Sequence, residues 1–92
     1  MGMSLERHFA QSLKVARKKA SLTQTQLGTL CGLNRTFISM LERGVRKPSL
    51  ESFMIIATQL KVPASTLLID LEQRIEIAEQ SKALAKSHLI NK

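Results

Sequence analysis

Apolar residues recur along most of this chain at the three- and four-residue steps of an α-helix. The clearest example lies between residues 4 and 20, where Ser4 can cap the start of a helix. The apolar face of that predicted helix consists of Leu5, Phe9, Leu13, Ala16 and Ala20. No stretch keeps the two-residue alternation of a half-buried strand, and no Asn-Gly or Asp-Gly turn joins two β-branched runs. The pattern therefore predicts an all-α fold.

Two short helices follow, and each has its own start and stop signals. Thr23 opens a capping box for a helix over residues 23–31, and Gly32 supplies the left-handed residue that ends it. Asn34 caps a second helix, over residues 35–43. Because only about three residues join the two helices, the chain must bend sharply between them. Such a pair is a helix-turn-helix.

The next helices are predicted from cap residues, prolines and apolar content. Ser49 caps a helix over residues 50–61, and Pro63 stands where a further helix can begin. We expect the helix over residues 50–61 to lie in the core. Its apolar residues are Leu50, Phe53, Met54, Ile56, Ala57 and Leu60.

Beyond residue 72 the composition shifts toward Glu, Gln, Lys and Ala, while an apolar seam continues. The seam consists of Leu68, Leu71, Ile75, Ala78, Lys82, Ala85 and Leu89. About two to three heptads are fewer than a coiled coil requires, so this segment either contacts another chain or folds back on its own domain. We expect a domain over residues 4–71 and an additional C-terminal helix over residues 72–92. The residues expected at a dimer contact are Leu67, Leu68, Leu71, Ile75 and Ala78.

The charge distribution indicates a polyanionic partner. The chain carries 14 Lys and Arg against seven Asp and Glu. Its first 50 residues hold nine of the basic residues and two of the acidic ones, whereas the remainder is balanced at five of each. This asymmetry is typical of a half that faces nucleic acid and a neutral half with another task. A mildly basic chain can also serve solubility alone.

Composition excludes several other classes of protein. An apolar content of 43% is that of a folded domain. A single cysteine cannot form an internal disulfide, which fits the reducing cytoplasm. No apolar run is long enough for a membrane span, and the N-terminus lacks the pattern of a signal peptide. We therefore expect a cytoplasmic protein.

Signs of catalysis and of metal binding are missing from the sequence. It contains no Walker loop, no dinucleotide glycine pattern and no nucleophile elbow. His8 and His88 have no other ligand type at metal-site spacing. Cys31 occupies an expected core position, which is typical of a buried, inert thiol. We expect neither an enzyme nor a bound metal or cofactor.

Residues 13–68 resemble the Cro/lambda-repressor-like helix-turn-helix family, also called the xenobiotic-response-element family of regulators. The resemblance is strongest in the two-helix core from Leu22 to Gly44, where the run Ile38-Ser-Met-Leu-Glu-Arg-Gly44 is distinctive. It extends through Pro48-Ser-Leu-Glu51 and Leu60-Lys-Val-Pro63 to Leu68. It implies five packed helices, the third of which lies in the major groove of DNA.

Within this family, the run Asn34-Arg-Thr-Phe-Ile-Ser is particularly similar to the reading helix of restriction-modification controller proteins. The family usually has Ala where this chain has Gly28. Glycine costs about 1 kcal/mol of helix propensity but keeps a close helix contact possible. We therefore expect lower stability and an unchanged fold.

The resemblance and the docking geometry together assign binding roles, because the first residues of the recognition helix reach the base edges. Arg35 is the first candidate, since its guanidinium can bond O6 and N7 of guanine together. Asn34 can instead act only as a cap, and Met40 only as filler. The residues expected to read bases are Asn34, Arg35, Thr36, Ser39 and Met40. Those expected to bind phosphates are Gln24, Arg43, Arg46, Lys47, Ser49 and Ser52.

Arg17 and Glu42 match family positions that pair with each other. The resemblance therefore implies a structural strut between the first and third helices rather than a DNA ligand. Phe37 is expected in the core, although in controller-like members the aromatic residue at this place can approach DNA.

These observations favour a sequence-specific regulator that binds double-stranded DNA as a homodimer, at a two-fold symmetric operator. We expect it to be encoded by a bacterium or phage and associated with the nucleoid. Two alternatives stay open: an antitoxin whose residues 72–92 wrap a toxin, and a protein-interaction module that does not bind DNA. A membrane-surface helix over residues 72–90 is disfavoured by its mixed charges and lack of aromatic residues.

Overall fold

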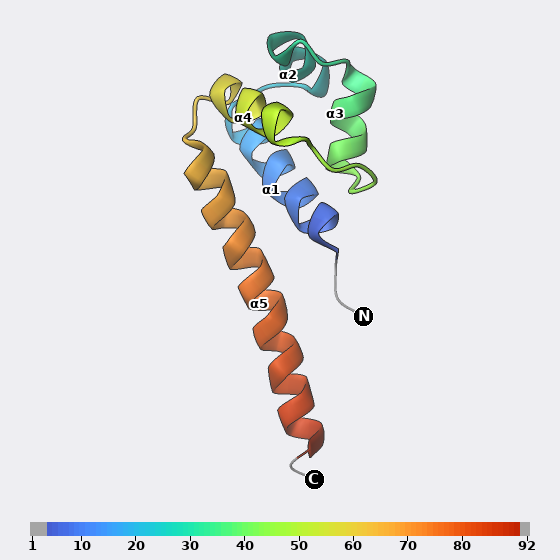
Figure 1. Cartoon of the computed structure of the whole chain (residues 1–92), viewed down its shortest axis with the longest axis vertical. Helices are drawn as coiled ribbons and strands as arrows, with labels where there is room; N and C mark the ends of the chain where they lie inside the picture. Colours follow the sequence, from blue (N-terminus) through green and yellow to red (C-terminus); the bar gives the residue numbers. More distant parts are fainter. Residues whose placement is uncertain (1–3, 91–92) are drawn as a thin grey trace.

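Residues 4–90 fold into five helices joined by short turns (Figure 1). The computed structural model describes the backbone of residues 4–90 and the side chains of residues 4–80. The helices are α1 (Leu5–Lys19), α2 (Gln24–Cys31), α3 (Arg35–Glu42), α4 (Leu50–Gln59) and α5 (Ala64–Ile90). Residues 4–90 contain no strand, and the predicted all-α, five-helix fold is confirmed.

The first four helices begin at hydroxyl or amide cap residues. Ser4, Thr23, Asn34 and Ser49 each accept a hydrogen bond from the backbone N–H three residues further on. At α2 the cap is reciprocal, because the Gln26 side chain also accepts from the backbone N–H of Thr23 at 2.8 Å. These bonds satisfy amides that a helix start would otherwise leave unpaired.

The same four helices also end alike. In each, a residue with positive φ follows the last turn, and the N–H after it reaches back five residues to a helix carbonyl. This is the Schellman arrangement. The left-handed residues are Ser21, Gly32, Gly44 and Lys61, with φ between 57° and 73°. Only two of the four are glycines, so α1 and α4 end at positions that side chains adopt at a cost.

The core lies where α1, α2, α3 and α4 meet the first turns of α5. Its buried residues are Phe9, Leu13, Leu27, Cys31, Ile38, Leu41, Phe53, Ile56, Ala57, Leu60 and Leu67. Burial raises the pKa of the Cys31 thiol, which keeps it protonated and poorly reactive.

Three apolar residues expected in buried faces lie on the surface instead. Leu50 is 79% exposed, Leu5 54% and Met54 48%. They lie in the first turns of α1 and α4 and at the start of the second turn of α4. The expectation that all apolar residues of α4 are buried is therefore wrong for Leu50 and Met54.

The C-terminal helix is not a separate element but the continuation of α5, which runs unbroken from Ala64 to Ile90. Good helix formers fill this stretch, and no Gly or Pro interrupts it. Figure 1 shows α5 passing α1 and extending beyond the end of that helix. The seam positions Lys82, Ala85 and Leu89 lie outside the described side chains.

Polar side chains join α5 to α1. Arg74 donates to Asp70 at 2.8 Å and to Gln11 of α1 at 3.3 Å. The Ser12 hydroxyl and the Arg74 guanidinium hold the pKa of the Asp70 carboxyl below its ordinary value, against the opposing effect of burial. Asp70 therefore stays ionised at neutral pH and holds Arg74, whose guanidinium makes the hydrogen bond to α1.

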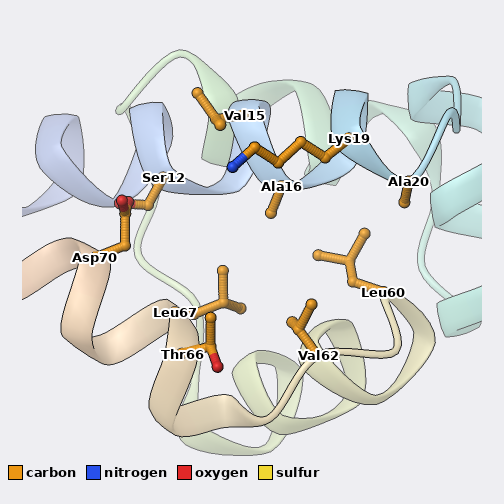
Figure 2. A pocket seen from close by; sticks show the side chains of 10 residues that line it. All are labelled: Ser12, Val15, Ala16, Lys19, Ala20, Leu60, Val62, Thr66, Leu67 and Asp70. Atoms are coloured by element: carbon orange, nitrogen blue, oxygen red, sulfur yellow. The ribbon is translucent and has the colours of Figure 1, made fainter.

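Packing between α1 and α5 leaves a cavity of about 230 Å³ (Figure 2). On the α1 side it is lined by Ser12, Val15, Ala16 and Lys19, together with the C-cap residue Ala20. Leu67 forms part of the opposite wall and is only 4% exposed. Leu67 is thus a core residue of its own chain, with little surface left for the dimer contact at which it was expected.

Gly28 is required by a close approach between α2 and the following turn. A Cβ at this position would lie 2.7 Å from the carbonyl oxygen of Leu33. The glycine therefore permits this turn, and its cost in helix propensity is offset by the contact it allows.

The left-handed end of α4 is a position where a substitution should stabilise the fold. Lys61 is exposed at φ 60°, where a side chain costs about 1–2 kcal/mol and glycine does not. Lys61→Gly should therefore raise the free energy of unfolding by about 1 kcal/mol, measured by urea denaturation. Gly32→Ala, at φ 67° with open space around it, should lower it by a similar amount. A loss of stability in Lys61→Gly would contradict this account of the helix end.

Candidate nucleic-acid interface

The third helix presents one buried and one open face. Ile38 and Leu41 are fully buried, whereas Arg35, Thr36 and Arg43 are exposed. The remaining positions expected to face DNA, Ser39 and Met40, are half-buried. Asn34 is exposed, but its side-chain oxygen already accepts from the N–H of Phe37 at 2.8 Å. Its NH₂ group and the second lone pair of the oxygen are left to meet a ligand.

A two-pronged ion pair holds this helix against α1. Arg17 donates from Nε to Oε2 of Glu42 at 2.6 Å and from Nη2 to Oε1 at 2.9 Å. The two side chains are only 10% and 3% exposed. The third nitrogen, Nη1, donates to the carbonyl oxygen of Leu22 at 2.8 Å. This hydrogen bonding to Glu42 raises the pKa of Arg17 above its ordinary value. Each of the three guanidinium nitrogens therefore has a partner inside the protein.

Gln24, the first residue of α2, joins the same network. Its Nε2 donates to Oε1 of Glu42 at 3.1 Å. The side chain therefore braces α3, while Gln24 and Thr25 also line an open hollow that Arg35 borders. The starts of α2 and α3 thus come together around one surface depression.

Basic residues gather just after α3. Arg43, Arg46 and Lys47 are all exposed within five residues of the chain. The Arg46 guanidinium lies 5.8 Å above the ring of Phe37, a distance at which cations and aromatic rings attract each other. Phe37 is only half-buried, so its expected core role is partial.

Lys47 makes a contact that sequence reasoning missed. Its Nζ lies 3.7 Å from Oε1 of Glu6, at the start of α1. The side chain is 73% exposed, so this pair is weak and screened by solvent. No local sequence signal marks the contact, because it joins residues 41 positions apart.

Ser49 and Ser52 are occupied by the start of α4. The Ser49 oxygen accepts from the Ser52 N–H at 3.0 Å, and its hydroxyl donates to the Ser52 hydroxyl at 3.0 Å. Ser49 is exposed beside Lys47 and Pro48. Its capping role is visible in the structure, and a phosphate contact stays a prediction.

A second candidate surface is an apolar groove of about 360 Å³ between the starts of α1 and α4 and the first half of α5. Its large apolar lining residues are Leu5, Phe9, Leu50, Phe53, Met54, Leu68 and Leu71. Leu68 is 48% exposed, and Ile75 and Ala78 are half-buried further along α5. Sequence reasoning found the α5 residues of this apolar groove but missed Leu5, Leu50 and Met54.

Other kinds of site are not visible in the described part of the chain. Among these residues, no three His, Cys, Asp or Glu side chains gather as metal ligands. No single helix there is long and apolar enough to span a membrane. Helix α4 and the first part of α5 reach that length and apolarity only when taken together, and the chain bends by 110° between them.

Comparison with known proteins gives consistent matches. A helix-turn-helix family model matches residues 13–67. Control protein C.BamHI of Bacillus amyloliquefaciens is 38% identical over 61 residues, which cover 65% of this chain and 75% of that protein. The crystal structure of the restriction-modification controller protein C.AhdI from Aeromonas hydrophila is 34% identical, with a TM-score of 0.66 over 67% of this chain and 94% of that one.

Other matches concern the fold or only part of a longer protein. The clp gene regulator ClgR from Corynebacterium glutamicum has a TM-score of 0.83 over 95% of this chain and 93% of that one. At 20% identity this likeness shows a shared fold. Two further relatives are longer, and the chain spans 27% and 56% of their lengths.

Loss of the ion pair between α1 and α3 should destabilise the fold. Glu42→Ala leaves Arg17 charged, largely buried and without its partner, which should lower the free energy of unfolding by about 3 kcal/mol. Glu72→Ala, at an exposed position of α5, should change it by less than about 0.5 kcal/mol. Thermal and urea unfolding check both values. The double variant Arg17→Ala/Glu42→Ala should lose less than the sum of the single losses, and additive losses would contradict pairing.

Proposed function

The chain belongs to the helix-turn-helix family, and from this premise we propose that it is a sequence-specific transcriptional regulator that binds double-stranded DNA as a homodimer. The observation that carries the proposal is the open face of α3. A buried ion pair holds this face in place, and the exposed cations Arg43, Arg46 and Lys47 border it. The similarity to restriction-modification controller proteins supports the same role. Such a regulator acts in the cytoplasm, at the nucleoid.

In this proposal α3 enters the major groove and Arg35 reads a base. Arg35 is exposed at the first turn of α3 and makes no hydrogen bond within the described chain. Its five donors are therefore free for a two-pronged contact with guanine. Thr36 and Ser39 follow on the open side of the helix, and Met40 offers a half-buried apolar edge for a thymine methyl group.

Phosphates on either side of the groove are bound by the residues around α3. Arg43, Arg46 and Lys47 lie on one side, and the N-terminus of α2 with Gln24 lies on the other. These contacts set the register of α3 on the duplex and carry no sequence information. Arg17 is assigned a structural role instead, because each of its three guanidinium nitrogens already donates to Glu42 or Leu22.

The homodimer forms through the apolar groove. Leu5, Leu50, Met54 and Leu68 leave about half or more of their surface in water. Contiguous apolar surface of this kind is typical of protein contacts. With a two-fold axis through the groove, the same residues of both protomers form the contact. A single substitution therefore changes the contact at two symmetric places. In this arrangement residues 4–71 bind DNA, while Ile75, Ala78 and the rest of residues 72–92 extend the dimer contact.

Selection of duplexes from a random DNA pool tests the function. We expect a two-fold symmetric site whose half-sites are about one helical turn, ~34 Å, apart. Arg35→Ala should remove the preference at one guanine in each half-site and weaken binding by about 1–3 kcal/mol per contact. Enrichment of no site by the folded wild-type protein would overturn the proposal. An unchanged base preference in Arg35→Ala would remove the assigned role of Arg35.

A charge placed in the apolar groove tests the dimer contact separately from DNA binding. Leu68→Lys places a charge in the apolar groove and should shift the protein from dimer to monomer in sedimentation analysis. Ile69→Lys is the matched control, because Ile69 is 53% exposed but lies outside the apolar groove. Monomerisation by both variants, or by neither, would show that this groove is not the contact.

A further inference from the structure

Three basic residues of α1 share one solvent-facing stripe that the proposed binding roles leave unused. Arg7, Lys14 and Lys18 stand seven and four residues apart, which places them within about 40° of one another around the helix. All three are exposed. We call them the α1 basic stripe, and it extends over about 16 Å of helix.

The remaining charges of α1 point elsewhere. Arg17 is buried against Glu42, and Lys19 borders the cavity that faces Asp70 of α5 (Figure 2). Glu6, the one acidic residue of α1, lies against Lys47. The α1 basic stripe therefore carries three positive charges with no carboxylate from its own helix among them.

This stripe lies beside the candidate DNA surface. Helices α1 and α3 pack against each other through Arg17 and Glu42, and both bury their opposite faces in the same core. The α1 basic stripe therefore belongs to a helix that packs directly against α3. Arg7 also touches the turn after α3, since a Cβ at Gly44 would lie 2.9 Å from its Cγ. The cations at 43–47 thus continue directly onto α1.

We propose that the α1 basic stripe binds the phosphate backbone of the duplex outside the half-site read by α3. This inference rests on the proposed function and extends its footprint. A row of exposed cations without apolar or aromatic residues among them fits a polyanion of regular charge and carries no base information. Its effect is added affinity from flanking DNA of any sequence.

Two double variants with the same net charge test the proposal. Lys14→Gln/Lys18→Gln removes two charges of the α1 basic stripe, whereas Lys19→Gln/Lys61→Gln removes two exposed lysines outside it. Lys18 and Lys19 both lie in the last turn of α1, so the two variants lose the same helix-dipole interaction there. Binding is measured over a range of salt concentrations, on the selected operator alone and on the operator with eight added base pairs at each end.

We expect wild type and Lys19→Gln/Lys61→Gln to bind the longer duplex more tightly than the shorter one. Lys14→Gln/Lys18→Gln should lose this gain, and its salt dependence on the longer duplex should become shallower by about two phosphate contacts per chain. Equal effects of both variants, or no gain from flanking DNA in wild type, would overturn the proposal. Specific binding of wild type to neither duplex would instead overturn the proposed function itself.

Discussion

The Glu42 carboxylate is the point on which the geometry of the candidate interface depends. It is 3% exposed and accepts from two nitrogens of Arg17 and one of Gln24. Three helices therefore meet at one side chain. Burying a carboxylate is costly unless its oxygens are paired, so the arrangement is stable only while both partners stay in place. The direction of α3 relative to α1 and α2 follows from that requirement.

Such a constraint is needed because two of the three helices it joins are short. Helix α2 and helix α3 have eight residues each, well below the length at which an isolated helix is stable in water. Caps at their starts and Schellman turns at their ends satisfy the backbone, and Ile38, Leu41 and Leu27 supply apolar contact. The open face of α3 contributes little to this stability. Its side chains are consequently free to be chosen for a ligand.

Much of the fold could be predicted because its signals are local. The capping box at Thr23, the caps at Asn34 and Ser49 and the stop at Gly32 depend on residues within one turn of each other. The left-handed ends at Ser21 and Lys61 have no such signal, since neither residue type favours positive φ. In these two places the next residue, Leu22 or Val62, packs against the core, and its N–H closes the turn.

Exposure was harder to predict than helix position, for a physical reason. Periodicity shows that Leu50 and Met54 belong to an apolar helix, but burial depends on which other element covers that face. The same limit applies to Leu67, which lies in the core, and its neighbour Leu68, which does not. Arg17 and Glu42 could be paired only through the family resemblance, because no local pattern relates residues 25 positions apart.

Charge and apolarity are separated around α1, and this separation limits what each surface can bind. Leu5 and Phe9 face the apolar groove, whereas Arg7, Lys14 and Lys18 face away from it. A membrane surface would require cations around an apolar patch. Among the described residues, Lys47 is the one cation that lines the apolar groove, and its Nζ lies 3.7 Å from Glu6. A second copy of the chain can therefore cover the apolar groove while leaving the α1 basic stripe and the open face of α3 accessible to DNA.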